Sequence, residues 1–259
     1  GGSATQYFTG KFDGNKFVAD EKSEKWIDWG TDNYAGVTWS DIPQSDGRRL
    51  FLGWMSNWNY ASVVPTTTWR SAMTIPRELL LAYENGSYYL ISRPVRELTN
   101  LRKESKSIIP GEAGNSSGAD LIIDVPGLNQ SELEFDLRIP EGYNESLGII
   151  LENNLDEKLI IGYSVQAKQL FIDRTKSGNT SFSERFAGVA TAPYESGKTL
   201  KMQLFIDASS VELFIDEGKL VMTSLIFPAE NYTKLRFLSG DANIYPEKID
   251  FYELGSIWP

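Results

Sequence analysis

The chain has 259 residues, of which 41% are hydrophobic and 23% charged, a composition typical of one large folded domain or two modest ones. Its 35 acidic residues outnumber its 25 basic residues and give a net charge of −10. Because an acidic surface repels phosphate backbones and anionic lipid headgroups, we expect neither a nucleic-acid partner nor a membrane partner. Cysteine and histidine are absent, which excludes disulfides, Cys/His zinc sites and catalysis by serine–histidine or cysteine–histidine pairs.

Acid–base chemistry in this chain must therefore use carboxylates, lysine or tyrosine, and we expect no metal and no cofactor. The compositional excess is aromatic, with 7 Trp, 12 Tyr and 13 Phe. Aromatic faces beside carboxylates and amides are typical of sugar-binding surfaces. The cores of all-β domains also use aromatic residues, so composition alone leaves both interpretations open.

Residues 1–93 are predicted to be rich in β-strands and contain six of the seven tryptophans. Strand-like sequence begins at residues 6–12, and further strands are predicted at residues 35–40, 50–54, 73–81 and 88–92. Turn-like segments separate these strands, a pattern typical of a β-propeller. We therefore interpret residues 1–93 as propeller blades.

Residues 94–110 are predicted to link this region to a second domain. Val95, Leu98 and Leu101 follow helical spacing among charged residues, which indicates one or two turns of helix. We place the domain boundary within this linker.

From residue 111 to residue 259 the dominant period is two. Apolar side chains alternate along residues 200–206 and 211–215, and turn residues at 207–209 and 216–219 close hairpins. Further strands are predicted at residues 133–139, 147–151, 159–165, 170–173, 220–227, 235–238 and 249–254. Many short, closely spaced strands predict an antiparallel β-sandwich over residues 111–259.

Six Asn-x-Ser/Thr sequons occur, at Asn85, Asn115, Asn129, Asn144, Asn179 and Asn231. In a secreted eukaryotic protein they would be glycosylation sites on surface loops, and in a bacterial protein they would be polar turns. The first residues carry neither the basic nor the apolar segment of a signal peptide.

Polar and aromatic residues concentrate at residues 26–36 and at residues 53–73. In the structural interpretation, Asp28 and Asp32 cap turns and the tryptophans fill space between blades. In the functional interpretation, the carboxylates accept hydrogen bonds from sugar hydroxyls, indoles stack on sugar C–H faces, and Asn57 both donates and accepts.

These regions carry three motifs: D-x-G-x-D-x-Y-A at residues 28–35, G-W-M-S-N-W-x-Y at 53–60 and P-x-x-x-W-R-S-A-M-x-I-P-R at 65–77. Three more follow: L-F-I-D-R-T-x-S-G at 170–178, F-I-D-x-S-S-V-E-L-F at 205–214 and I-F-P at 226–228. In this order, over nearly the whole chain, the motifs resemble glycoside hydrolase family 32. Its invertases, inulinases and levanases act on β-fructofuranosides, and the resemblance is closest to the exo-acting inulinases and levanases.

The resemblance implies an all-β fold, the last blades of a five-bladed β-propeller followed by a C-terminal antiparallel β-sandwich. The family's nucleophile, transition-state stabiliser and acid/base lie in Asn-Asp-Pro, Arg-Asp-Pro and Glu-Cys motifs. This sequence contains no Asp-Pro pair and no cysteine. The resemblance therefore implies a C-terminal fragment with no catalytic residue of its own, inactive without the N-terminal blades.

The resemblance also implies candidate substrate-binding residues. Trp58 matches a position that lines the terminal-fructose pocket, and Asp28 matches an acidic position near that pocket. Asn57 and Asp32 belong to the same motifs and complete the set, with a structural role as the alternative for both. The 209–214 segment is interpreted as part of the sandwich core, with Glu212 as its exposed member and without a catalytic role.

The leading hypothesis is thus a C-terminal fragment of a retaining β-fructofuranosidase acting on fructans or sucrose. The alternative is a non-catalytic carbohydrate-binding or structural β-sandwich module. Expected partners are fructan or sucrose, reached through the intact parent, and the N-terminal half of the propeller. A homodimer is a further way to cover unpaired blade surface. We expect a secreted, periplasmic or cell-surface location, with any signal peptide in the part of the parent that precedes this chain.

Overall fold

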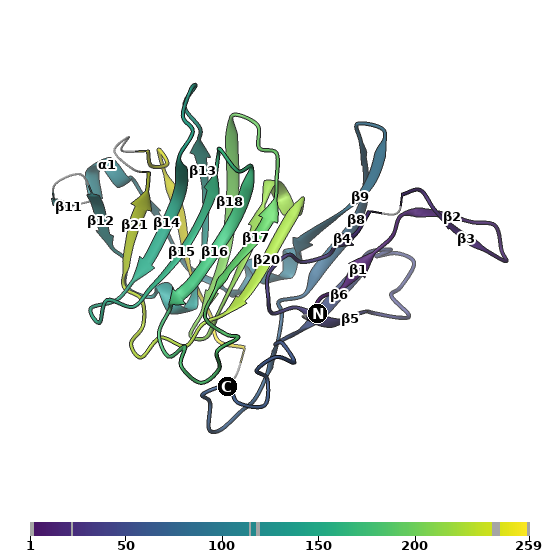
Figure 1. The fold of residues 1–259 in the computed structure, drawn as a ribbon, viewed down its shortest axis with the longest axis horizontal. Coiled ribbons are helices and arrows are strands. Elements are labelled where there is room, and N and C mark those ends of the chain that lie inside the picture. The colour runs from purple at the N-terminus through teal and green to yellow at the C-terminus, as the bar shows by residue number, and fades with distance from the viewer. Residues whose placement is uncertain (1–2, 22, 114, 118–119, 240–243, 258–259) are drawn as a thin grey trace.

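The structure, a computed structural model, describes residues 3–21, 23–113, 115–117, 120–239 and 244–257 (Figure 1). Strands dominate the described residues, and helix is limited to α1 (Pro110–Ala113) and three short 3₁₀ segments, η1 (Arg96–Leu101), η2 (Leu128–Gln130) and η3 (Asp216–Gly218). The described part of the chain is therefore all-β. It contains no helix with the length and apolar character needed to cross a membrane.

Residues 3–94, here called the N-terminal unit, form small antiparallel sheets. Strand β1 (Gln6–Tyr7) pairs with β4 (Lys25–Trp26), and β2 (Gly10–Phe12) pairs with β3 (Phe17–Ala19). The main sheet has the order β5 (Tyr34–Thr38), β6 (Arg49–Met55), β8 (Arg77–Glu84), β9 (Ser87–Pro94), with β7 (Ala72–Met73) also pairing with β6. Asn85 and Gly86 join β8 to β9 with φ values of 52° and 85°, which is the left-handed backbone that a two-residue hairpin requires.

Residues 102–254, here called the two-sheet unit, form two larger antiparallel sheets. The six-stranded sheet runs β10 (Arg102–Ile108), β22 (Ile249–Leu254), β13 (Ser131–Arg138), β18 (Thr199–Asp207), β19 (Ser210–Ile215), β20 (Leu220–Leu225). The seven-stranded sheet runs β11 (Asn115–Ser117), β12 (Asp120–Asp124), β21 (Lys234–Leu238), β14 (Ser146–Glu152), β15 (Lys158–Ser164), β16 (Gln169–Lys176), β17 (Val189–Pro193). Strands β14, β15 and β16 pair in chain order, as do β18, β19 and β20, and the turns predicted at residues 207–209 and 216–219 close the last two hairpins.

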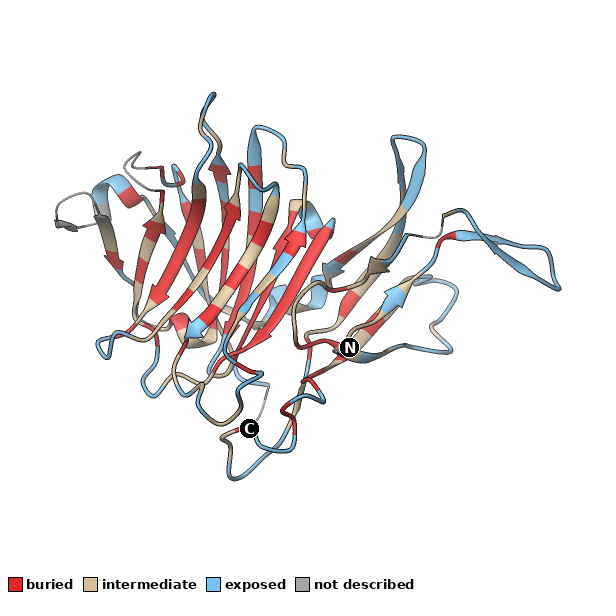
Figure 2. Cartoon of the chain, in the orientation of Figure 1, coloured by how far each residue is buried: buried red, intermediate tan, exposed pale blue. Residues whose placement is uncertain are grey.

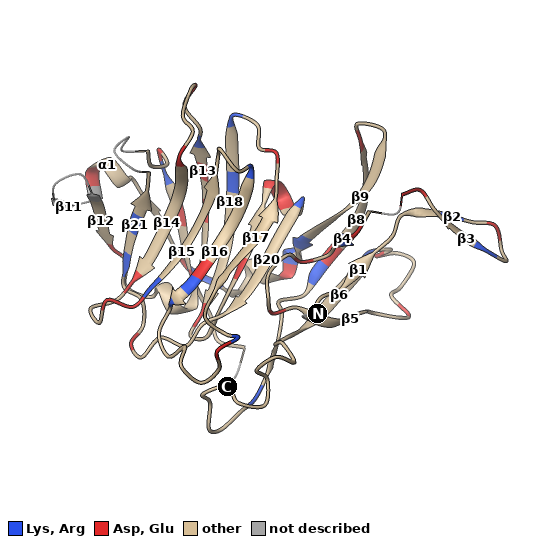
Figure 3. Ribbon diagram, in the orientation of Figure 1, with Lys and Arg blue, Asp and Glu red and all other residues tan. Residues whose placement is uncertain are grey.

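A single hydrophobic core joins the two large sheets. Leu204 of the six-stranded sheet and Ile149 of the seven-stranded sheet are both fully buried members of this core. Their strands carry apolar side chains at every second position, because alternate residues of a strand point to the same face. Figure 2 shows this burial along most strands of the unit, and Figure 3 shows that charged residues interrupt these strands only at separate positions.

The segment between the two units differs from the predicted linker of residues 94–110. The predicted helical turns are the 3₁₀ segment η1, and residues 102–108 form β10, which pairs with β22 in the six-stranded sheet. The strand was missed because its sequence, R-K-E-S-K-S-I, lacks apolar alternation. As an edge strand, β10 can keep charged side chains in water while its backbone completes the sheet.

The sequons that the structure describes lie mostly on the surface. Four asparagines are exposed: Asn85, Asn144, Asn179 and Asn231. Asn129 is half-buried in η2, and the side chain of Asn115 lies outside the described part.

The N-terminal unit joins the two-sheet unit along β20, the edge strand of the six-stranded sheet (Figure 1). The backbone N–H groups of Trp29 and Asp32 donate to the carbonyl oxygens of Val221 and Thr223, at 2.8 and 3.2 Å. Between them, a Cβ on Gly30 would lie 2.0 Å from the Thr223 oxygen. A glycine is therefore required for this close approach.

Candidate functional site at the junction of the two units

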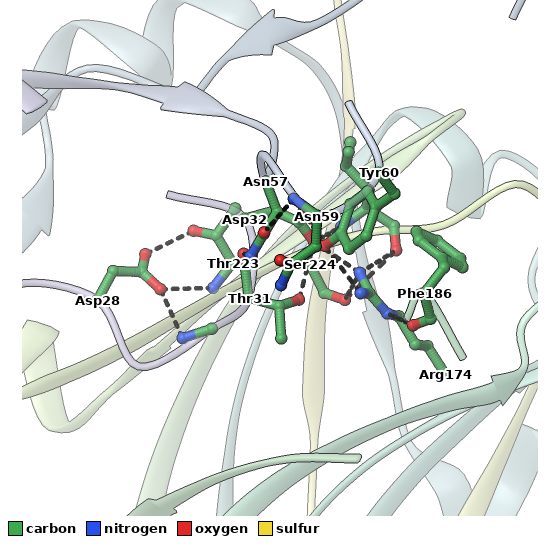
Figure 4. A network of polar contacts seen from close by, with 12 residues as sticks. Asp28, Thr31, Asp32, Asn57, Asn59, Tyr60, Arg174, Phe186, Thr223 and Ser224 are labelled. Atoms are coloured by element: carbon green, nitrogen blue, oxygen red, sulfur yellow. Dashed lines mark hydrogen bonds and ion pairs between the residues drawn. The ribbon is translucent and has the colours of Figure 1, made fainter. Parts of the chain in front are cut away.

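The carboxylate of Asp28 lies at this junction and is buried, with 1% of the residue exposed. One oxygen accepts from the Arg77 guanidinium at 2.8 Å and from the Thr223 hydroxyl at 2.6 Å. The other accepts from the backbone N–H groups of Gly30 and Thr223, at 2.8 and 2.9 Å (Figure 4). Both oxygens of Asp28 are thus occupied by groups of the protein itself.

Arg77 connects this cluster to a second buried carboxylate, Glu212 of β19. The guanidinium donates to Glu212 at 2.5 Å, and the other Glu212 oxygen accepts from the backbone N–H of Ile75 at 2.8 Å. Burial raises the pKa of Glu212, and the nearby guanidinium opposes that rise. The prediction that Glu212 is exposed is wrong. The residue is buried because it provides the two-sheet side of an ion pair that joins the units.

The second candidate carboxylate, Asp32, has a matching environment formed by Arg174 and Tyr60. Arg174 of β16 donates to one Asp32 oxygen at 2.6 Å, and the Tyr60 hydroxyl donates to the other at 2.5 Å. Arg174 also donates to the Tyr60 hydroxyl at 2.9 Å. Burial opposes the charge of Arg174, but attraction from Asp32 and Tyr60 and the hydrogen bonds to them together outweigh this effect and raise the pKa of the guanidinium. Burial likewise raises the pKa of Tyr60, which keeps its hydroxyl protonated as a donor.

Asn57 begins the tight turn over residues 57–61. Its side-chain amide donates to the Thr31 carbonyl at 2.8 Å, and its side-chain oxygen accepts from the Asn59 N–H at 3.0 Å (Figure 4). Its backbone carbonyl accepts from the N–H groups of Tyr60 and Ala61. The buried side chain of Asn57 therefore fixes the turn to the segment that carries Asp32.

Trp58 is the member of the predicted set that faces outward, with 72% of the residue exposed. Its backbone N–H donates to the Ser3 hydroxyl at 3.0 Å. Its ring lies 5.1 Å from the ring of Trp54 at an angle of 48°, and Trp54 in turn meets Tyr34 edge-on. The N-terminal unit thus presents a small aromatic surface beside the buried charges.

The structure gathers the four predicted residues in one region but divides their roles. Asp28, Asp32 and Asn57 are buried with their polar atoms engaged in the fold, so the structural alternative describes their environment. Burial of the Asp28 and Asp32 side chains favours the structural role for both, and a role of either in substrate binding stays a prediction. Trp58 is accessible, and its role in substrate binding stays a prediction.

Sequence reasoning missed the two arginines that organise this junction. A signal for Arg174 was present, because residues 170, 172 and 174 share one face of β16 and the first two are buried leucine and isoleucine. An arginine on an apolar face must find a buried partner. Arg77 carried no such signal within its half-buried strand. Among the described residues, no group of three or more Asp or Glu side chains is arranged to hold a metal ion.

Comparisons with known proteins agree with the resemblance. The family model for the "Glycosyl hydrolases family 32 N-terminal domain" matches residues 1–94, and the model for "Glycosyl hydrolases family 32 C terminal" matches residues 97–253. A levanase from Bacillus subtilis (strain 168) is 35% identical over 100% of this chain and 38% of its own length. An extracellular exo-inulinase from Aspergillus awamori is 30% identical over 99% of this chain and 49% of its own length.

Solved structures give the same result. The crystal structure of the exo-inulinase from Aspergillus awamori matches 98% of this chain and 50% of that chain, with a TM-score of 0.82 and 29% identity. A β-fructofuranosidase from Schwanniomyces occidentalis matches 97% of this chain and 53% of that chain, with a TM-score of 0.78 and 22% identity, which supports the fold. The chain spans about half, or less, of the length of the relatives it matches.

Proposed function

We propose that this chain, which belongs to glycoside hydrolase family 32, is the C-terminal part of a retaining β-fructosidase that acts on fructans or sucrose. The observation that carries this proposal is the tandem match of both family domains across nearly the whole chain. It is supported by full-length alignment of this chain with a levanase and an exo-inulinase. The extracellular exo-inulinase among these relatives supports a location outside the cytoplasm for the parent protein.

Within this proposal, residues 3–94 are the last blades of a five-bladed propeller and residues 102–254 are the β-sandwich. The four-strand path β5-β6-β8-β9 is the arrangement expected of a propeller blade. Two antiparallel sheets that share one core are the arrangement expected of a sandwich.

The catalytic carboxylates would come from the part of the parent that this chain does not include. Retaining hydrolysis needs a nucleophile and an acid/base about 5–5.5 Å apart across the scissile bond. Asp28 and Asp32 cannot supply this pair, because each is buried and neutralised by an arginine. The other expected partner, the N-terminal half of the propeller, would cover the apolar side chains that the N-terminal unit exposes.

The contribution of this chain to substrate binding would be Trp58. An indole offers a flat apolar face and one N–H donor, which suit a furanose ring with a C–H face and hydroxyl edges. The tilted ring of Trp54 supports that indole from one side. The two-sheet unit would act as a brace, because Arg174 and Glu212 extend from it into the N-terminal unit.

The test is Trp58→Ala in the longer protein, with kcat/KM on sucrose, inulin and levan measured beside the melting temperature. Loss of a substrate contact should lower kcat/KM about ten- to two-hundred-fold, equivalent to about 1–3 kcal/mol, with little change in melting temperature. The matched control is Trp39→Ala, an exposed tryptophan of the same unit outside the 57–61 turn. Unchanged kinetics in a destabilised Trp58 variant would show that the indole only packs.

The 259-residue chain by itself is expected to release no fructose from these substrates. Purified chain would be assayed beside its own Trp58→Ala variant, which serves as the background. Release above that background would overturn the proposal that the catalytic pair lies elsewhere.

A further inference from the structure

Arg174 belongs to the two-sheet unit but contacts the turn that carries Trp58 and the segment to which that turn is fixed. Its guanidinium donates to Asp32 at 2.6 Å and to the Tyr60 hydroxyl at 2.9 Å. A third donor, Nε, bonds the Phe186 carbonyl at 2.7 Å, and the Phe186 ring lies 3.9 Å from the guanidinium carbon. Phe186, in the loop that follows β16, therefore holds the Arg174 guanidinium in place on the side of the two-sheet unit, while its other donors bond the N-terminal unit (Figure 4).

Each of the two contacts continues into the turn that carries Trp58. On one side, Tyr60 is part of the turn, and its N–H donates to the Asn57 carbonyl at 3.0 Å. On the other side, the Thr31 hydroxyl donates to Asp32 at 2.9 Å, and the Thr31 carbonyl accepts from the Asn57 side chain. One arginine thus holds both ends of the Asn57–Tyr60 segment, directly at Tyr60 and through Asp32 and Thr31 at Asn57.

The orientation of Trp58 depends on this backbone. Its side chain is mostly in solvent, so core packing does not fix its rotamer. The contacts that hold it are the Trp54 ring at 5.1 Å and the hydrogen bond from its N–H to the Ser3 hydroxyl. A shift of the turn would therefore carry the indole with it.

The Arg77 cluster provides an internal comparison. It is equally buried and also joins the two units, but its contacts run to Asp28, Glu212 and Thr223. None of these three residues belongs to the 57–61 turn. Substitutions of Arg77 and Arg174 can therefore be compared: both weaken the interface between the units, but only those of Arg174 should affect the orientation of Trp58.

We propose that Arg174 is a positioning residue, which sets the orientation of Trp58 from the two-sheet unit through Asp32 and Tyr60. The kinetic consequence rests on the proposed function, in which Trp58 contacts the sugar. The structural consequence does not, and it can be measured in the chain alone.

The structural test uses the 259-residue chain labelled with 5-fluorotryptophan and observed by ¹⁹F NMR. Trp58→Phe assigns the Trp58 resonance, and the Trp39 resonance serves as an internal reference. Arg174→Lys keeps the charge but loses the fork, and Tyr60→Phe removes one hydroxyl while keeping the ring. Both variants should shift or broaden the Trp58 resonance, whereas Arg77→Lys should leave it at the wild-type position. A Trp58 resonance unchanged in folded Arg174→Lys and Tyr60→Phe would overturn the proposal.

The kinetic test uses the longer protein with the same three variants. Because misplacement of a contacting group by about 1 Å can cost about a hundredfold in rate, Arg174→Lys should lower kcat/KM about tenfold. Arg77→Lys should change kcat/KM by less than about threefold at a temperature where all variants are folded. If Trp58→Ala has no kinetic effect, the proposed function of Trp58 fails while the NMR result still decides the positioning. If Arg77→Lys moves the resonance as much as Arg174→Lys does, the effect is general loosening and the proposal is wrong.

Discussion

The two-sheet unit and the N-terminal unit are both antiparallel β-structures, yet they bury their apolar residues very differently. In the two-sheet unit, side chains such as Leu133, Ile161 and Leu204 meet in one core and are fully buried. In the N-terminal unit, large apolar residues face solvent over much of the surface: Phe8, Phe12, Phe17, Val18, Val37, Trp39, Trp58, Val63, Trp69, Met73, Leu81, Tyr83 and Tyr88. In Figure 2 the hairpin β2–β3 and the outer end of the hairpin β8–β9 are pale blue, whereas the strands of the two-sheet unit are largely red.

The difference follows from the number of layers. A sheet must bury its apolar face against a second layer, and the two sheets of the C-terminal region provide that layer for each other. The N-terminal sheet instead meets the two-sheet unit along the edge of β20, through two buried charged clusters and a small apolar cluster in which Met55, Tyr60 and Val64 pack with Phe186 and Leu225. Much of its apolar surface is left for another partner, for which we propose the rest of the parent protein.

The largest effect should be seen in native-state hydrogen exchange of the 259-residue chain as a dilute monomer. Amides of β18, in the core of the two-sheet unit, should exchange on the order of 100-fold or more slowly than those of β8, a difference of about 3 kcal/mol in opening free energy. Residues 102–259 expressed alone should keep their slow amides. Equal protection in β8 and β18 would contradict the comparison.

The buried ion pairs between the units give the next effect. Arg77→Ala leaves Asp28 and Glu212 as unpaired buried carboxylates, and breaking such a pair costs about 3–5 kcal/mol. The loss should appear first in the N-terminal unit, as faster exchange in β8 and a lower first melting transition. The control is Arg93→Ala in the same hairpin, an exposed arginine that pairs with the half-buried Glu78, and it should cost less than about 1 kcal/mol.

The apolar face of β8 gives a smaller effect that depends on what covers it. Leu81 and Tyr83 are 62% and 63% exposed, so Leu81→Ser and Tyr83→Ser should change the stability of this chain by no more than about 0.5 kcal/mol. Both variants should raise the monomeric fraction measured by sedimentation, because they remove apolar surface that promotes association.

The same variants sharpen the test in the longer protein. If the rest of the propeller covers β8, they should lower its melting temperature clearly, whereas Leu155→Ser in an exposed loop of the two-sheet unit should not. No change for Leu81→Ser and Tyr83→Ser in the longer protein would mean that this face has no intramolecular partner.

The sequence predicted most strands of the two-sheet unit, because they alternate over one buried face. Residues 200–206 and 211–215 lie within β18 and β19, and the turns at 207–209 and 216–219 close their hairpins. Strand β10 was missed because its apolar alternation is absent. Period-two reasoning detects a strand by its contact with a core, and an edge strand with polar faces gives no such signal.

The sequence predicted where the candidate residues lie more accurately than it predicted which groups they contact. Local motifs placed Asp28, Asp32, Asn57 and Trp58 together, and the structure agrees. Whether a carboxylate faces a sugar or an arginine depends on partners far along the chain. Arg174 lies 142 positions from Asp32, and Thr223 lies 195 positions from Asp28. A single sequence does not reveal such long-range pairs.

The smallest predicted effect concerns the exposed charges where the N-terminal unit meets η1. Arg48 donates to Asp46 and to Glu97, and these hydrogen bonds lower the pKa of both carboxyls, from 3.8 and 4.5 respectively, to about 2. Because the folded-state pKa values are depressed, this contribution to stability is complete above about pH 5 and is lost as the pH falls toward 2.

The test is an NMR titration of the two carboxyls in wild type and in Arg48→Gln. In the variant, both midpoints should return toward 3.8 and 4.5, and the decrease in melting temperature between pH 5 and pH 3 should become smaller. Because the carboxylates of Asp46 and Glu97 lie at the surface, 0.5 M NaCl should reduce the lowering of their pKa values in wild type. Salt should leave the buried Arg77 and Arg174 clusters nearly unchanged. Midpoints that stay near 2 in Arg48→Gln would show that another group holds these carboxylates.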